Sequence, residues 1–305
     1  MDIDRLLDRA FKKAKLVEKA AFGRKKTKER IILKIQTFSN VVYDKLNNYL
    51  LKYPMITGYL EEFVKIKYDI NKIRKYIASL IWAKNKIRSL AREYIKKVKS
   101  EKEERKIVNL LRSFYGRSVS ILKRIKDKVE YLNEVLRFIK EKIPEIEEKK
   151  KIFVLGPPKA GKSTFLKMLT GKKSIKVADY AFTTKKIDKT ALRGFDIQLF
   201  DTPGILRDKF EDMNEIEKLA YVACGLADYV IFILDPTEIV MTIDDQIKLI
   251  NSLPKKPNLI IISKKDLIDE NKMNKIKKKV KGIFMNLLDE KEYEKIIEIF
   301  RKEFS

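Results

Sequence analysis

Hydrophobic positions in the first half of the chain repeat at helical spacing. Over residues 70–98 they fall three or four residues apart, and a second long series runs over 103–142. Two earlier helices are predicted at 3–22 and 28–51, before a segment at 54–58 that contains Pro and Gly. An antiparallel bundle of about four helices is the simplest way to bury these apolar stripes.

From residue 151 onward, short apolar runs alternate with amphipathic segments. This alternation is typical of an α/β domain with a mostly parallel sheet and helices on both faces. Strands are predicted at 151–155, 195–200, 229–235, 258–263 and 282–285, with a weaker one near 186–193. Helices are predicted at 214–226, 243–252, 272–280 and 291–303. We therefore expect a helical bundle over 1–143, an acidic linker over 144–150 and an α/β domain over 151–305.

The positive charge of the chain is concentrated in the predicted bundle. Residues 1–150 contain 40 Lys and Arg against 20 Asp and Glu, whereas residues 151–305 contain 29 against 23. An excess of +20 on one half indicates a polyanionic partner, and we favour RNA over a merely solvated surface. DNA is not expected as a partner.

Several features argue against a membrane or secreted protein. No run of 18 apolar residues is present, and the opening MDIDRLLDRA is charged throughout, so neither a membrane span nor a signal peptide is expected. The single cysteine, Cys224, suits a reducing compartment. We expect a cytoplasmic protein.

A phosphate-binding loop is predicted directly after the first strand of the α/β domain. The residues GPPKAGKS follow the apolar run KIFVL and precede the helix-like FLKMLT. In this context Gly-x-x-x-x-Gly-Lys-Ser turns backbone N–H groups around a phosphate chain. The alternative is an ordinary Gly-rich turn. The candidate nucleotide-binding residues here are Gly156, Pro157, Pro158, Lys159, Ala160, Gly161, Lys162, Ser163 and Thr164.

Two further motifs follow strands of the same domain. In DTPG, Asp201 can hold Mg²⁺ through a water, and the Gly204 amide can sense a γ-phosphate. In SKKD, comprising Ser263, Lys264 and Asp266, the carboxylate suits the adjacent N1–H and N2–H₂ donors of guanine. Adenine would leave that carboxylate unpaired, which argues against an ATP-dependent enzyme.

Together these motifs resemble a GTPase of the translation-factor class. YAFTTK followed by DTPGIL is similar to the Obg/HflX superfamily, while DPTE and IDDQIKLINSL resemble its NOG subfamily, with archaeal members. The resemblance extends into the helical half through SLAREYIKKVKS and GRSVSILKRIKDKVEYLNEV. It implies a P-loop GTPase domain preceded by an all-α bundle that binds large-subunit rRNA and acts in ribosomal large-subunit assembly.

The resemblance also assigns roles to individual residues. Thr184, with Thr183 as second choice, would ligate Mg²⁺ and sense the γ-phosphate; the alternative is an ordinary polar pair in a loop. Residues 172–190 would form the first switch and residues 201–214 the second. The implied catalytic residues are Lys162, Thr184 and Gly204, and the implied Mg²⁺ ligands are Ser163, Thr184 and, through water, Asp201.

Four positions depart from the family pattern. Lys159 stands where most relatives carry an Asn that helps to bind a monovalent cation, so we expect hydrolysis that does not need potassium. Ser263 replaces the usual Asn of the guanine motif, a loss of about 1 kcal/mol in binding. The Ser-Ala loop that backs guanine O6 is not recognisable near 284–288. Ile205 occupies the position of the water-orienting Gln, which predicts slow turnover.

The leading hypothesis is a slow GTPase that binds GTP, GDP and Mg²⁺ and assists assembly of the large ribosomal subunit, with rRNA or a pre-ribosomal large subunit as partner. The alternative is a non-hydrolysing RNA-binding scaffold that guanine nucleotide merely stabilises. Stimulation of turnover by large subunits would discriminate between the two.

Overall fold

The computed structural model describes residues 1–21, 26–53, 56–171, 188–191 and 194–304. The chain divides into two compact units. The first comprises Met1–Thr57 with Tyr68–Phe138, and the second comprises Gly58–Lys67 with Ile139–Ser305. A short segment of the first half, Gly58–Lys67, therefore groups with the second unit.

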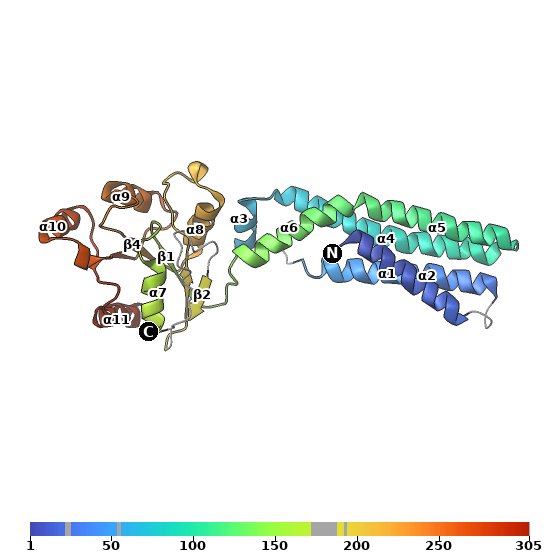
Figure 1. Cartoon of the computed structure of the whole chain (residues 1–305), viewed down its shortest axis with the longest axis horizontal. Helices are drawn as coiled ribbons and strands as arrows, with labels where there is room; N and C mark the ends of the chain where they lie inside the picture. Colours follow the sequence, from blue (N-terminus) through green and yellow to red (C-terminus); the bar gives the residue numbers. More distant parts are fainter. Residues whose placement is uncertain (22–25, 54–55, 172–187, 192–193, 305) are drawn as a thin grey trace. The chain divides into compact units, whose positions relative to one another are not determined.

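The first unit is a bundle of long helices (Figure 1). They are α1 (Ile3–Ala21), α2 (Thr27–Leu50), α4 (Ile70–Ser100), α5 (Glu104–Arg124) and α6 (Lys126–Lys142). Their buried side chains recur at helical spacing, so each helix turns one apolar stripe to the core. Aromatic rings cross between helices at the centre, where the centroids of Phe38 and Phe114 lie 5.8 Å apart. The predicted bundle is confirmed.

The helix predicted over 103–142 is two helices. Ile125 ends α5 with φ −104° and ψ 2°, and α6 begins at the next residue. No Gly or Pro stands at this position, and Ile125 itself is buried, at 1% exposure. The buried stripe of α5 begins at Ile107.

The second unit is built on a six-stranded sheet in the order β2-β3-β1-β4-β5-β6. Its strands are β1 (Lys150–Leu155), β2 (Asp188–Ala191), β3 (Ile197–Asp201), β4 (Tyr229–Leu234), β5 (Leu259–Ile262) and β6 (Ile283–Phe284). All neighbouring pairs are parallel except β2 with β3. The helices are α7 (Lys162–Thr170), α8 (Glu215–Leu226), α9 (Ile243–Ser252), α10 (Glu270–Lys279) and α11 (Tyr293–Phe304). This confirms the predicted α/β domain.

Helices cover both faces of the central strands (Figure 1). On one face, Ile152 and Val154 of β1 pack with Phe165 of α7 and Ile296 of α11. The alternate residue, Phe153, points to the opposite face and stacks on Phe200 with ring centroids 4.3 Å apart. Central parallel strands must be apolar on both faces, which explains their uninterrupted hydrophobic runs.

A short helix from the first half of the chain belongs to the second unit. In α3 (Tyr59–Lys65), Leu60, Phe63 and Val64 are buried, and the helix packs beside α8. Lys67 then pairs with Glu215 at the start of α8, at 2.7 Å.

Among the residues that the structure describes, no helix is long and apolar enough to cross a membrane. Cys224 is buried, and burial raises the pKa of its thiol to about 11, so the thiol stays protonated at neutral pH.

Candidate functional site: a phosphate loop at the ends of the parallel strands

The phosphate loop joins the end of β1 to the start of α7, and its shape requires glycine at two positions. Gly156 has φ 145°, and a Cβ there would lie 2.3 Å from the carbonyl oxygen of Ile233. Gly161 has φ 100°, and a Cβ would lie 2.5 Å from Cδ1 of Leu287. The positive φ disfavours a side chain at both positions, and at Gly156 the Ile233 backbone also leaves no room for one. The loop leads directly into the N-terminus of α7, where backbone N–H groups attract anions.

Lys162 is the buried cation of this loop. Its side chain is only 6% exposed, and its Nζ donates to the carbonyl oxygens of Gly156 (3.1 Å) and Pro157 (2.8 Å). Burial lowers the pKa of Lys162 to about 8, although the nearby Asp201 carboxylate opposes this shift. An incoming phosphate would stabilise the protonated ammonium.

Ser163 and Asp201 meet beside Lys162, although they lie on different elements. The Ser163 hydroxyl, on the first turn of α7, donates to Oδ2 of Asp201 at the end of β3. β1 and β3 are parallel neighbours, so both elements deliver their residues to the same edge of the sheet. A hydroxyl and a carboxylate are hard oxygen donors of the kind that Mg²⁺ prefers, so the pair fits one ion completed by phosphate and water.

The DTPG segment rests on the phosphate loop. A Cβ on Gly204 would lie 2.5 Å from the backbone N of Pro158, so only glycine permits this approach. The next N–H, of Ile205, donates to the carbonyl of Gly156 at 3.2 Å, and the Ile205 side chain is fully buried. Thr202 is also buried and donates to the Val154 carbonyl. A change in the phosphates bound by the loop would therefore act directly on residues 204–205.

Glu217, which the sequence analysis did not single out, organises the segment after DTPG. Its side chain is buried and accepts from the N–H of Leu206 (2.8 Å), the N–H of Asn214 (3.0 Å) and the guanidinium of Arg207 (2.6 Å). Asn214 and Glu217 form a capping box at the start of α8. The spacing Asn-x-x-Glu is readable in the sequence and was the available signal. Arg207 is thus held by Glu217.

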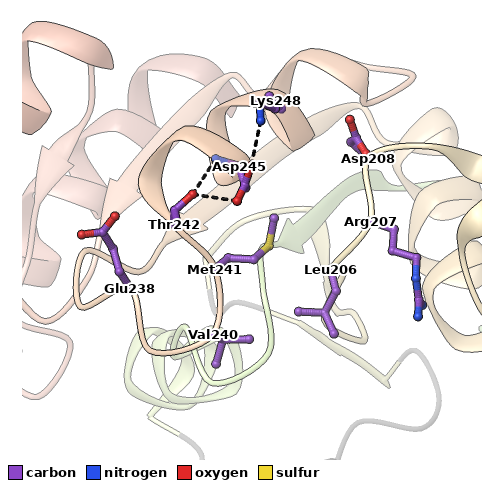
Figure 2. A pocket seen from close by; sticks show the side chains of 9 residues that line it. All are labelled: Leu206, Arg207, Asp208, Glu238, Val240, Met241, Thr242, Asp245 and Lys248. Carbon is purple, nitrogen blue, oxygen red and sulfur yellow. Dashed lines mark hydrogen bonds and ion pairs between the residues drawn. The ribbon is translucent and has the colours of Figure 1, made fainter.

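A cavity of about 590 Å³ opens beside this segment. Figure 2 shows Leu206, Arg207 and Asp208 on one side and Val240, Met241 and Thr242 on the other. The second wall is fixed by the N-terminus of α9, where the Thr242 hydroxyl accepts from the N–H of Asp245 at 3.1 Å. The wall formed by residues 206–208 therefore belongs to the predicted second switch, whereas the wall formed by residues 240–242 lies outside it.

The guanine motif follows β5, but its side chains are partly engaged by the protein. Ser263 is fully buried, and its hydroxyl donates to the Leu234 carbonyl at 3.1 Å. Lys264 adopts the left-handed conformation, with φ 52°, and its Nζ pairs with the buried Asp235 at 2.6 Å. This pairing was not foreseen, although Asp235 belongs to the DPTE motif. Asp266 lies in a short 3₁₀ turn and is exposed, so its carboxylate is available to a ligand.

A loop after β6 completes this edge of the site. The Met285 carbonyl accepts from the N–H of Lys265, at 3.4 Å, and Leu287 packs against Gly161. The Tyr293 hydroxyl donates a hydrogen bond to the Leu287 carbonyl at 2.9 Å and so fixes the loop. Residues 285–288 therefore lie between the guanine motif and the phosphate loop, although they contain no Ser-Ala sequence.

The remaining predicted residues are placed less centrally or lie outside the described ranges. Lys159 is exposed at the tip of the loop and has φ 63°, a conformation that favours Asn or Gly. Thr164 is half-buried on α7, and Ala160 is buried. Thr183, Thr184 and almost all of the predicted first switch at 172–190 lie outside the described residues.

Two family models match the chain over most of its length. One, described as NOG1 N-terminal helical domain, matches residues 2–147. The other, described as 50S ribosome-binding GTPase, matches residues 151–265. The two matches meet close to the linker expected at 144–150.

Similar proteins are found in archaea and eukaryotes. Uncharacterized protein MJ1408 of Methanocaldococcus jannaschii is 32% identical over 79% of this chain and 70% of its own length. Nucleolar GTP-binding protein 1 of Eremothecium gossypii is 29% identical over 87% of this chain. The match spans 43% of the length of that relative. Among solved structures, Era of Aquifex aeolicus bound to GDP and AlF₄⁻ is 23% identical, with a TM-score of 0.42 over 51% of this chain and 56% of that chain.

Proposed function

Because the chain belongs to the NOG1 family of GTP-binding proteins, we propose that it is a slow GTPase that assists assembly of the large ribosomal subunit. The observation that carries the proposal is the convergence of Lys162, Ser163 and Asp201 at the carboxyl ends of β1 and β3. The guanine motif follows β5 at the same edge of the sheet.

In this proposal each group has a defined role. The loop amides and Lys162 would bind the β- and γ-phosphates, Ser163 and Asp201 would hold Mg²⁺, and Asp266 would select guanine. Thr184 would complete the Mg²⁺ site. Residues 285–288 are positioned to back the guanine base, in place of the missing Ser-Ala loop.

Slow hydrolysis follows from the residue after DTPG. Ile205 is buried and apolar, so its side chain cannot orient a water molecule, and Arg207 is engaged by Glu217. The missing group would come from the particle to which the protein binds. The contact of Gly204 with Pro158 provides a route by which the γ-phosphate alters residues 204–207 and the adjoining cavity. Differential affinity of the two nucleotide states for the particle is what hydrolysis requires to drive release.

Large-subunit rRNA is the partner that fits the basic helical unit. The first 150 residues carry a net charge of +20, and the family model for their helical domain covers nearly all of them. Binding through many Lys and Arg should weaken steeply as salt is raised, because condensed counterions are released from the RNA. A flat salt response would point to a protein partner instead.

The proposal is tested by GTP turnover of the purified chain alone, with isolated large ribosomal subunits, and with small subunits as the matched control. We expect slow release of phosphate from the chain alone and stimulation by large subunits only. Intact GTP binding without turnover under any of these conditions would favour the non-hydrolysing RNA-binding scaffold, for which the buried Ile205 is the supporting observation.

Lys159 predicts hydrolysis that is independent of potassium. Its ammonium carries positive charge at the tip of the phosphate loop, where an Asn would help to hold a monovalent cation. Rates of phosphate release should therefore be equal in sodium and potassium buffers. Lys159→Asn suits the backbone at φ 63° and should make hydrolysis faster in potassium than in sodium. Strong potassium stimulation of the unsubstituted chain would contradict the prediction.

A further inference from the structure

Trp82, the single tryptophan of the chain, stands exposed in the middle of α4. Its side chain is 47% exposed, and the preceding residue, Ile81, is 42% exposed. The core contacts of α4 are made by other positions, among them Leu80, Ala83 and Ile87. The core of α4 therefore does not need the Trp82 ring, and an exposed aromatic ring can serve as a stacking platform for a nucleic-acid base.

Along α4 the charge on either side of Trp82 is entirely positive. Residues 71–92 contain seven Lys and Arg and no acidic residue. Lys75, Ser79 and Lys86 lie at i−7, i−3 and i+4 from Trp82, so they share its face of the helix. We call these four residues the Trp82 face. The two lysines are exposed and stand about 10 Å and about 6 Å along the helix from Trp82, one on each side.

A second helix adds a cation to this face. Nζ of Lys128, at the start of α6, donates to the hydroxyl of Ser79 at 2.9 Å. The same ammonium lies 5.9 Å from the ring centroid of Tyr76. The Trp82 face is therefore bordered by lysines from both α4 and α6.

We propose that the Trp82 face binds a single-stranded segment of RNA, with one unpaired base stacked on the indole and the flanking phosphates on Lys75, Lys86 and Lys128. The inference rests on the proposed RNA-binding function and assigns it a site and a class of RNA. Lysines on both sides of an aromatic ring are the arrangement that proteins use for single strands. Inside a paired helix the neighbouring base pairs cover both faces of every base, and only the two terminal pairs expose one, so the Trp82 face favours looped over duplex RNA.

Fluorescence of the full-length chain, excited at a wavelength that tryptophan absorbs and tyrosine does not, tests this directly, since Trp82 is the single tryptophan. The probes are an RNA hairpin with a single-stranded loop and a blunt RNA duplex with the same number of nucleotides. At saturation the looped RNA should quench the emission strongly through stacking, whereas the duplex should leave it nearly unchanged. Equal quenching by both RNAs would refute base stacking.

Binding by substituted chains provides the second readout. Trp82→Ala should weaken binding of the looped RNA by about tenfold and leave duplex binding unchanged, while Trp82→Phe should retain most of the affinity. Lys86→Gln should weaken binding of both RNAs and reduce the slope of log affinity against log salt concentration by about one. Tyr59→Ala, which removes an exposed aromatic ring from the second unit, is the matched control and should change neither affinity.

The outcomes separate this inference from the proposed function. If the unsubstituted chain binds both RNAs and Trp82→Ala changes neither, the Trp82 face is refuted and RNA binding stands. If the unsubstituted chain binds neither RNA, the proposed RNA-binding function itself fails. A change in Trp82 emission caused by RNA-free ribosomal proteins and by no RNA would assign the face to a protein partner and overturn the inference.

Discussion

Replacing Lys162 by alanine is expected to weaken GTP binding by about 10²- to 10⁴-fold and to abolish measurable hydrolysis. A hydrogen bond to a charged group contributes about 1.5–3 kcal/mol, and the buried ammonium would make two, to the β- and γ-phosphates. The substitution also removes a cation that burial disfavours, so folding should not suffer. Isothermal calorimetry with GDP and GTP, together with circular dichroism, measures both effects.

Lys167→Ala is the matched control for this experiment. Lys167 lies on the same helix, little more than one turn beyond Lys162, but only Lys162 faces the carbonyl groups of the phosphate loop. Affinity and turnover of Lys167→Ala should equal those of the unsubstituted chain. If Lys162→Ala binds GTP as tightly as the unsubstituted chain, the assignment of GTP binding to the phosphate loop is wrong.

The lowered pKa of Lys162 gives the same prediction a pH dependence. In the nucleotide-free chain half of the Lys162 ammonium groups have lost their proton at about pH 8, whereas bound phosphates would hold the proton. Nucleotide binding above this pH therefore takes up a proton, and affinity should be constant below about pH 8 and fall by up to about tenfold per pH unit above it. In Lys162→Arg the guanidinium does not titrate, so whatever affinity remains should not show this decline.

The phosphate loop could be predicted because its evidence is local. The motif spacing, the preceding apolar strand and the following helix all fall within twenty consecutive residues, and the structure places β1 and α7 accordingly. The strand and helix pattern of the second unit was predictable for the same reason, since its central strands are uninterrupted apolar runs. The order of the strands was not, because it depends on pairing between segments far apart in the chain.

Three features have no signal in the local sequence. The seven residues of α3 are too few for a periodic signal, and their assignment to the second unit depends on packing beside α8. The end of α5 at Ile125 has no Gly or Pro to mark it. The ion pair between Lys264 and Asp235 joins the SKKD and DPTE motifs, but neither motif by itself indicates that these two residues pair.

Asp266→Asn is expected to lower GDP affinity by about 10²- to 10⁴-fold and to create affinity for xanthosine diphosphate. The exposed Asp266 carboxylate can accept from both N1–H and N2–H₂ of guanine, with about 1.5–3 kcal/mol for each bond. An Asn amide still accepts from N1–H, but its NH₂ group opposes the guanine N2–H₂. Xanthine carries a carbonyl oxygen at that position, so the same NH₂ group can donate to it. Competition of guanosine, xanthosine and adenosine diphosphates for a labelled nucleotide measures the change.

The matched control makes the same chemical change three residues further along the chain. Asp269 caps α10 by accepting from the N–H of Lys272 at 2.7 Å, and Asn caps helices as well as Asp does. Asp269→Asn should therefore retain both stability and preference for guanine. The base assignment fails if Asp266→Asn still prefers guanine to xanthine, or if excess ATP displaces the labelled guanine nucleotide from the unsubstituted chain. Since Ser263 directs its hydroxyl to the Leu234 carbonyl, base selection in this domain depends on Asp266 more heavily than the usual Asn-containing motif would require.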